Sequence, residues 1–354
     1  MYTITNKNNH KLSLTKYTVI IFLISFITFL TACKDTDINK ISTDDKYSSD
    51  IFAMDTYMSL TAYGSNAEES VMQAVHEIQR LDNMFSVGNN SSDVTILNNI
   101  GSSDVSDETK YLIETSVKIS DLTNGCFDIT IYPVMELWGF TDKNYKVPSE
   151  SELNEILSHV DYNNIHISGN EIVLDNSARI DFGGIAKGYT SGRVIQLLRE
   201  QGIEHAIINL GGNVQTLGTK PDGSQWRVAI QSPESDNEYI GILNTSDKAV
   251  ITSGGYERYF EDNGNTYHHI IDPETGYPSD SNLTSVTIIC DDGTIADAFS
   301  TSLFIKGLEK AVEFYKSSDI DFDMILLDKD NNIYITENIQ DTFNTSYNYN
   351  VIKK

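Results

Sequence analysis

Residues 180–189 read IDFGGIAKGY. The apolar and acidic residues Ile180 and Asp181 precede two glycines, and a segment with a helical pattern follows. The pattern predicts a strand that ends at Asp181, a turn at Gly183 and Gly184, and a helix that begins near Lys187. Glycines let a ligand approach the backbone closely, and free N–H groups at a helix N-terminus bind anions. The segment matches neither the Walker motif nor GxGxxG. It therefore indicates either an anion site beside Lys187 or a tight turn with a surface lysine.

The segments on both sides of this turn mix helical and strand patterns. Apolar spacing predicts helices over residues 66–84, 109–122 and 187–202, and helices that begin at residues 149 and 296. Strand patterns cover residues 52–63, 165–167, 172–174, 205–210, 214–217, 226–231, 249–252, 285–290 and 324–327. Because βαβ alternation is irregular, we expect an α+β fold, a single compact domain over residues 51–338 with mixed or antiparallel sheets and flanking helices. Residues 339–354 are expected to be a loosely ordered tail.

The charge balance of the chain is strongly acidic. Its 354 residues contain 25 Lys and Arg against 51 Asp and Glu, a formal net charge of −26, and 40% are hydrophobic, enough for a sizeable core. An acidic surface repels the phosphate backbone of nucleic acids, so the composition argues against a nucleic-acid-binding protein. A polyanionic ligand would need a bound cation or a local group of basic side chains.

The first 32 residues have the pattern of a lipoprotein signal peptide. Three lysines precede an apolar run over residues 17–30 that is short for a membrane span, and LTAC at residues 30–33 matches a lipobox. We expect lipid on the thiol of Cys33 and a protein anchored to the extracytoplasmic side of the cell membrane. An uncleaved anchor or a plain signal peptide is the alternative. Residues 33–50 are polar and are expected to form a flexible tether.

Two later segments carry groups that suit catalysis or metal binding. In YHHIIDPETGYP, residues 267–278, His269 precedes a turn and is either a base or ligand or a structural residue. In IADAFST, residues 295–301, a helix would place Asp297 and Thr301 on one face. A carboxylate and a hydroxyl so placed suit Mg²⁺ with water and phosphate in its shell. The alternative is a helix cap with a threonine that bonds back to its own helix.

Three further features have a structural and a functional interpretation. Aromatic and acidic residues in TNGCFDITIYP, residues 123–133, and LWGF, residues 137–140, suit a flat ring ligand or a packed core. Residues 254–259, GGYERY, form a pocket edge or only a turn. Cys126 and Cys290 have no metal-type spacing and are expected to be buried thiols.

Seven segments in order resemble the ApbE-type FAD:protein FMN transferases, flavin transferases of the bacterial cell envelope. The matching segments are MDTY (54–57), GCFDIT (125–130), DFGGIAKG (181–188), LGGN (210–213), SGGYE (253–257), HIIDPETGYP (269–278) and DAFST (297–301). Each segment alone is weak evidence, and their common order carries the resemblance. Many members of this family are lipoproteins, in agreement with the pattern at Cys33.

The resemblance implies a reaction and the residues that perform it. FAD is split at its pyrophosphate, FMN is joined through its phosphate to a Thr or Ser of a separate acceptor flavoprotein, and AMP leaves. The acceptor would be a subunit of a membrane redox complex or an extracellular flavoprotein, modified at a stretch like Ser/Thr-Gly-Ala-Thr. Mg²⁺ would be held by Gly184, Asp297 and Thr301, with His269 and Asp297 catalytic. The implied FAD contacts are Met54, Cys126, Phe127, Asp128, Asp181, Lys187 and Ile271.

The sequence departs from the family at Gly88, where members often carry an aromatic residue. A stacking contact on the flavin or adenine ring is therefore either absent or supplied by another residue. The acceptor hydroxyl needs a proton acceptor, which is either His269 or a nearby carboxylate. Two alternative functions use the same site. One is an FAD pyrophosphatase, in which water replaces the acceptor and FMN and AMP are released. The other is a non-catalytic FAD-binding lipoprotein.

Overall fold

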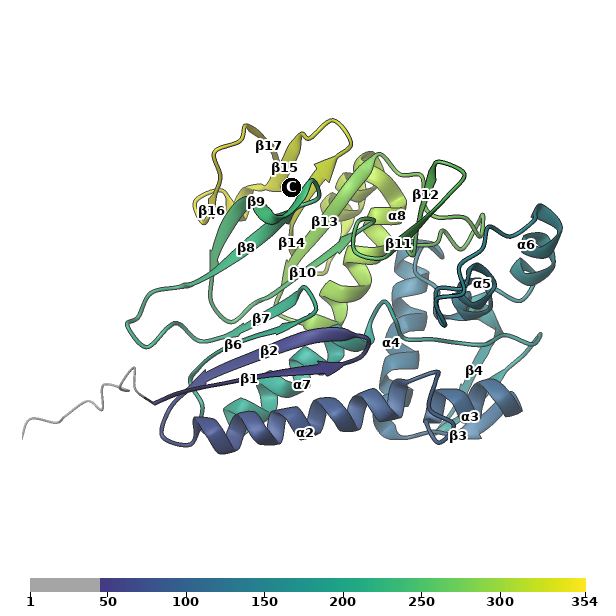
Figure 1. Ribbon diagram of the computed structural model, residues 1–354, viewed down its shortest axis with the longest axis horizontal. Coiled ribbons are helices and arrows are strands. Elements are labelled where there is room, and N and C mark those ends of the chain that lie inside the picture. The colour runs from purple at the N-terminus through teal and green to yellow at the C-terminus, as the bar shows by residue number, and fades with distance from the viewer. Residues whose placement is uncertain (1–44) are drawn as a thin grey trace, which may run out of the picture. The chain divides into compact units, whose positions relative to one another are not determined.

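The structure is a computed structural model that describes residues 45–354 (Figure 1). The expected signal peptide, Cys33 and most of the expected tether lie outside the described residues. Over residues 45–354, no helix combines the length and the apolar character needed to cross a bilayer.

A nine-stranded sheet forms the centre of the described chain, in the order β1-β2-β6-β7-β10-β13-β14-β15-β17. Its strands are β1 (Lys46–Ala53), β2 (Thr56–Tyr63), β6 (His205–Leu210), β7 (Asn213–Leu217), β10 (Ala249–Gly254), β13 (Leu283–Cys290), β14 (Asp323–Asp328), β15 (Ile333–Thr336) and β17 (Tyr349–Ile352). Neighbouring strands are antiparallel except β15 and β17, which are parallel. The central strand β13, LTSVTIIC, is buried on both faces along nearly its whole length. The α+β expectation is confirmed.

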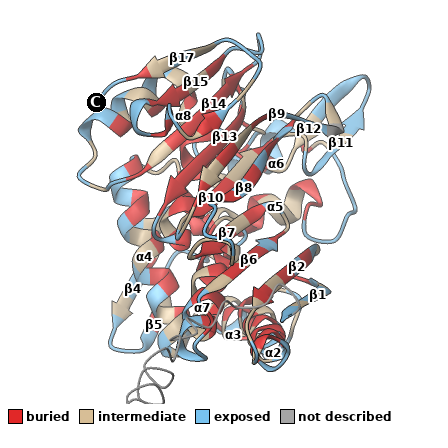
Figure 2. Ribbon diagram, turned by 90° about the vertical axis from the view of Figure 1, so that its left-hand side faces the viewer, coloured by how far each residue is buried: buried red, intermediate tan, exposed pale blue. Residues whose placement is uncertain are grey.

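Helices and a second sheet cover the central sheet. Helices α2 (Ala67–Phe85), α7 (Ala186–Glu200) and α8 (Gly293–Ser317) pack on it with apolar side chains (Figure 1). A small sheet of β16 (Phe343–Asn344), β9 (Ser235–Thr245) and β8 (Trp226–Ser232) shares a core cluster with β14 and β15. Buried residues accordingly run along the central strands, and exposed residues gather at the periphery (Figure 2).

The remaining elements complete the described chain. They are α3 (Asp93–Ile100), α4 (Asp107–Thr123), α5 (Tyr132–Trp138), α6 (Glu150–Leu157), the short helices η1 (Ile129–Ile131), η2 (Tyr162–Asn164) and η3 (Glu337–Ile339), the three-stranded sheet β3 (Ser102–Asp104), β5 (Glu171–Leu174) and β4 (Ile165–Ser168), and the hairpin β11 (Tyr259–Asp262) with β12 (Asn265–His268). The predicted hairpin around residue 169 is therefore confirmed as β4–β5.

Local sequence signals fix several element ends. Ser149 and Glu152 form the expected capping box of α6. Helix α7 is followed by Gly202 at φ 79°, a left-handed conformation that glycine adopts without strain. Helix α8 begins earlier than expected, because Asp292 accepts hydrogen bonds from the backbone N–H groups of Thr294 and Ile295.

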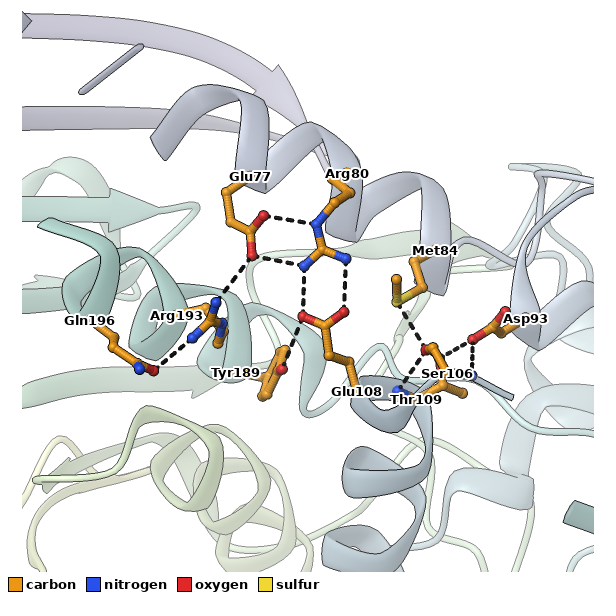
Figure 3. A network of polar contacts seen from close by, with 10 residues as sticks. All are labelled: Glu77, Arg80, Met84, Asp93, Ser106, Glu108, Thr109, Tyr189, Arg193 and Gln196. Carbon is orange, nitrogen blue, oxygen red and sulfur yellow. Dashed lines mark hydrogen bonds and ion pairs between the residues drawn. The ribbon is translucent and has the colours of Figure 1, made fainter. Parts of the chain in front are cut away.

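A polar network ties α2, α4 and α7 together (Figure 3). The Arg80 guanidinium donates to Glu77 on its own helix and to both carboxylate oxygens of Glu108, at 2.7 and 2.6 Å. Arg193 of α7 lies 3.7 Å from Glu77, and Tyr189 donates to Glu108 at 3.4 Å. The network holds the first half of α7, where the glycine turn ends, against its neighbours.

Several predicted boundaries are wrong, for identifiable reasons. The single strand expected over residues 52–63 is interrupted at Met54 and Asp55, whose φ values of 48° and 58° form the turn between β1 and β2. Residues 46–50, expected in the tether, form most of β1 because they pair with β2. Segment 178–182 is not a strand, since its backbone bonds to Ile129 and Asn98.

The C-terminal residues are also more ordered than expected. In the predicted loose tail, β17 pairs with β15 and Ile352 is buried in the core. Val351 and Ile352 supply apolar side chains to this edge strand, and Asn350 stays exposed.

Candidate functional site

Asp297 on α8 lies directly against the start of α7. Its side chain is only 3% exposed, and its Oδ2 accepts a hydrogen bond of 2.8 Å from the backbone N–H of Gly188. A Cβ atom on Gly188 would lie 2.6 Å from the Cβ of Asp297. Glycine at position 188 is therefore what allows α7 and α8 to approach this closely.

Thr301 lies one turn after Asp297 and faces the glycine turn. Its Oγ1 is 3.3 Å from the Ser253 hydroxyl at the end of β10, and Ser253 also bonds Ser300 at 2.8 Å. The Cβ position of Gly184 is 3.6 Å from the same Oγ1. Gly184, Asp297 and Thr301 are thus brought together. The cap alternative is wrong, since Asp292 caps α8 and Thr301 contacts Ser253 instead.

Oxygen atoms dominate this cluster. Over residues 45–354 no group of three or more His, Cys, Asp or Glu side chains is placed to hold a metal ion by itself. The group at Asp297 offers one carboxylate, one hydroxyl and the backbone of Gly184. This set fits a hard cation such as Mg²⁺ that keeps water and phosphate oxygens in its shell, and it does not fit a protein-enclosed zinc site.

Two basic side chains add positive charge beside the cluster. Lys187 and Arg258 form no ion pair within residues 45–354. Lys187 acts electrostatically on both Glu257 and His269, and Arg258 acts on Asp181 and His269. These unpaired cations provide the local positive region that an anionic ligand needs in so acidic a protein.

Glu257 follows the short turn after β10 and contributes a second carboxylate. Burial raises the pKa of its carboxyl group, Lys187 opposes the shift, and the charge of Asp297 adds to it. A Cβ on Gly212, in the β6–β7 turn, would lie 3.5 Å from its Oε1. A second carboxylate that feels the charge of Asp297 indicates a place where a bound cation would be stabilised.

His269 is oriented by the backbone of Arg258. Both its main-chain N–H, at 3.0 Å, and its Nδ1, at 3.1 Å, face the carbonyl oxygen of Arg258. A carbonyl only accepts, so Nδ1 carries the proton and Nε2 keeps its lone pair. Burial, then Arg258, lowers the pKa of His269 to about 3, which leaves the imidazole neutral at neutral pH.

Asp181 and Asp128 flank the other side of the glycine turn. The Asp181 carboxylate accepts from the N–H of Gly183 at 2.6 Å, and burial raises its pKa although Arg258 opposes the shift. The Asp128 carboxylate is already bonded by Thr130 and by the N–H of Tyr162. Burial raises its pKa as well. In this structure Asp128 therefore fixes the η1 and η2 turns.

The other expected contacts lie around this centre. Met54, at the β1–β2 turn, accepts a weak hydrogen bond from Thr190 of α7 at 3.8 Å. Phe127 is buried, with its ring 3.1 Å from the Cβ position of Gly184. Ile271 is buried and bridges to Pro278. Cys126 is half-buried, not buried as expected, whereas Cys290 is buried, and both thiols are free.

Sequence reasoning did not assign Glu257 and Arg258 to the site. The segment GGYERY had been interpreted as a pocket edge or a turn, and only their charges marked the two residues. A hollow of about 330 Å³ lies elsewhere, between β9 and β16, and none of the expected site residues lines it.

Fold and site together define an α+β protein whose glycine turn and α7 N-terminus meet an oxygen cluster, with unpaired cations alongside, as in proteins that bind phosphate-bearing ligands. A family model described as the ApbE family matches residues 54–326. The chain belongs to the ApbE family.

Named relatives agree with this assignment. The chain is 32% identical over 286 residues to an FAD:protein FMN transferase of Klebsiella pneumoniae, covering 77% of this chain and 86% of that protein. It is 32% identical over 256 residues to an FAD:protein FMN transferase of Vibrio cholerae, covering 70% and 77%. The crystal structure of an ApbE protein from Thermotoga maritima superimposes with a TM-score of 0.79 at 32% identity, over 84% of this chain and 99% of that one.

Proposed function

We propose that this chain is a Mg²⁺-dependent FAD:protein FMN transferase. It would split FAD at the pyrophosphate, attach FMN through a phosphoester to a Thr or Ser of an acceptor flavoprotein, and release AMP. The observation that carries the proposal is the meeting of Gly184, Asp297 and Thr301 at the start of α7, beside Lys187. Family membership supports the same reaction.

The pyrophosphate of FAD would lie at the glycine turn. Ile185, at the N-cap of α7, makes no side-chain hydrogen bond, and in the first turn Asp297 accepts from the N–H of Gly188. The partial positive charge of this helix end would attract an anion. Lys187 adds a full charge in the same place. The net charge of −26 would otherwise repel the dinucleotide, so these few groups account for its binding.

Mg²⁺ would be held by Asp297, Thr301 and Gly184. When bound, the ion supplies charge neutralisation at the phosphate oxygens. Asp297 is fixed for this role by Gly188, and Thr301 by Ser253. The protein contributes positioning: both side chains are held by neighbours that belong to other elements.

His269 is the proton acceptor that the geometry favours. Its Nε2 lone pair is available because Nδ1 is committed to the Arg258 carbonyl. A Thr or Ser hydroxyl that reaches Nε2 would transfer its proton there while its oxygen attacks phosphorus. Glu257 is the nearby carboxylate; burial raises its pKa, the charge of Asp297 adds to the shift and Lys187 opposes it.

Co-expression with a candidate acceptor tests the proposed function. Mass spectrometry should find the acceptor heavier by one FMN, AMP should accumulate with it, and chelation of divalent cations should stop both. Free FMN and AMP with an unlabelled acceptor would indicate a pyrophosphatase. Intact FAD that survives Mg²⁺ addition would indicate a binding protein.

We also propose that the mature chain is a lipoprotein anchored through Cys33. The lipobox LTAC and the polar stretch after it support this proposal. Fractionation of cells that express the chain should place it in the membrane fraction, and Cys33→Ala should release it or leave it unprocessed.

A further inference from the structure

The hairpin β11–β12 presents unpaired strand edges. Its two strands form a sheet of their own, with no third strand among residues 45–354. Asn263 and Gly264, at φ 50° and 80°, make the tight turn that joins them. Each strand therefore has one partner and one open side.

The ladder pattern identifies which backbone groups point outward. The N–H of His269 bonds to the carbonyl of Arg258, so this pair is hydrogen-bonded, and hydrogen-bonded and non-bonded pairs alternate from there. Glu261 and Thr266 consequently form a non-bonded pair whose N–H and C=O groups face away from the hairpin. In the described chain no backbone group bonds to them.

The hairpin is rigidly supported on one face. Phe260 stacks on Tyr145 at 5.0 Å and on its cross-strand partner Tyr267 at 5.4 Å, and Tyr267 contacts Trp138 at 5.3 Å. The edges are thus preformed, which lowers the entropy cost of binding another strand.

The hairpin is continuous with the proposed transfer site at its open end. Strand β12 leads directly into His269, and β11 is preceded by Glu257 and Arg258. The base of β12 contacts α8, where His268 packs edge-on against Phe304 at 5.6 Å. A strand added along it would run toward His269 and Arg258.

The negative charge of the hairpin limits the kind of segment that can bind to its edge. Glu261 and Asp262 on the hairpin, and Glu274 in the turn after β12, are exposed and form no ion pair within the described residues. An acidic occupant would be repelled. A short, extended segment of neutral or basic character is complementary to this edge.

We propose that the hydroxyl-bearing segment of the acceptor flavoprotein binds as an added β-strand along an outer edge of β11–β12. Main-chain hydrogen bonds to Glu261 or Thr266 hold the segment, and its Thr or Ser emerges at His269. The inference rests on the proposed function and assigns the surface by which that function recognises its protein substrate.

Proline substitutions test the edge without removing a ladder bond. Glu261→Pro and Thr266→Pro each delete one outward N–H, and proline is tolerated at such positions of an edge strand. Glu261→Ala and Thr266→Ala remove the same side chains but keep the N–H. The substrate is a synthetic peptide that contains Ser-Gly-Ala-Thr, and FAD affinity is measured separately by fluorescence.

We expect one proline variant to lose about tenfold or more in kcat/KM for the peptide relative to its alanine control, with its FAD affinity unchanged. The affected strand identifies the edge. Unchanged transfer in both proline variants would overturn the inference, as would a parallel loss of FAD affinity. If the wild-type chain labels no acceptor, the proposed function itself fails.

Discussion

Among single residues, Asp297 allows the most specific prediction, because it supplies the carboxylate of the proposed Mg²⁺ site. Asp297→Asn keeps an oxygen for the Gly188 N–H but removes the charge. We expect FMN transfer to fall at least about 100-fold and calorimetric Mg²⁺ titration with FAD to lose its signal. Asp291→Asn is the control, because Asp291 is 82% exposed and pairs only with Lys248. An unchanged Mg²⁺ requirement in Asp297→Asn would contradict the metal assignment.

The lowered pKa of His269 leads to a prediction about the pH dependence of FMN transfer. Its pKa is lowered to about 3, so its Nε2 stays unprotonated as the pH falls through the usual histidine range. The pH profile of kcat/KM should therefore show no inflection near 6.5 from this residue. His269→Gln should lower transfer about 1,000-fold while FAD binding persists.

The lowered pKa of His269 also predicts how the free energy of unfolding changes with pH. The unfolded chain binds a proton at His269 below pH 6.5, and the folded chain does so only near pH 3. The contribution of His269 to the free energy of unfolding is therefore complete above pH 6.5 and is lost as the pH falls toward 3. Buried Asp181 and Glu257, whose pKa values are raised, act in the opposite direction.

At the scale of elements, the contact between α7 and α8 decides the site. Gly188→Ala would place a methyl group against the Gly293 carbonyl and 2.6 Å from the Cβ of Asp297. We expect the helices to separate, with a loss of about 1–3 kcal/mol in the free energy of unfolding and weaker FMN transfer. Denaturant unfolding measures the first effect and a transfer assay measures the second.

Gly192 supplies the matched control on the same helix. Apart from the neighbouring backbone of its own helix, no heavy atom lies within 4 Å of the position of its Cβ. Gly192→Ala should stabilise the chain by about 0.5–1 kcal/mol through helix propensity and leave transfer unchanged. Equal effects at both positions would contradict the close approach at Gly188.

At the scale of the whole molecule, the C-terminal strand belongs to the core. Ile352→Ala should reduce the free energy of unfolding by about 2–4 kcal/mol, because Ile352 is buried where β17 pairs with β15. Asn350→Ala, at an exposed residue of the same strand, should change it by less than about 0.5 kcal/mol. Thermal unfolding of both variants checks the difference, and equal melting temperatures would mean that residues 339–354 are a dispensable tail.

Much of the fold could be predicted from periodicity. The helical spacing of Val71, Val75, Ile78 and Leu81 placed α2 correctly, and the glycine at position 202 marked the end of α7. The errors lie in segments whose structure is decided by pairing with a neighbouring strand and not by local propensity. Residues 46–50 and 349–352 are polar enough to look unstructured, and they are strands because β2 and β15 lie beside them.

The sequence by itself determined the α+β class, the glycine turn at residues 183–184 and the one-turn spacing of Asp297 and Thr301. These are local properties, set by side-chain size, backbone freedom and helical repeat. Only the tertiary structure decided that the pair faces this turn, that Ser253 supports Thr301, and that Glu257, Arg258 and His269 share its electrostatic environment. Those relations join segments that lie many residues apart in the chain, and no short-range rule of sequence specifies how distant strands and helices pack.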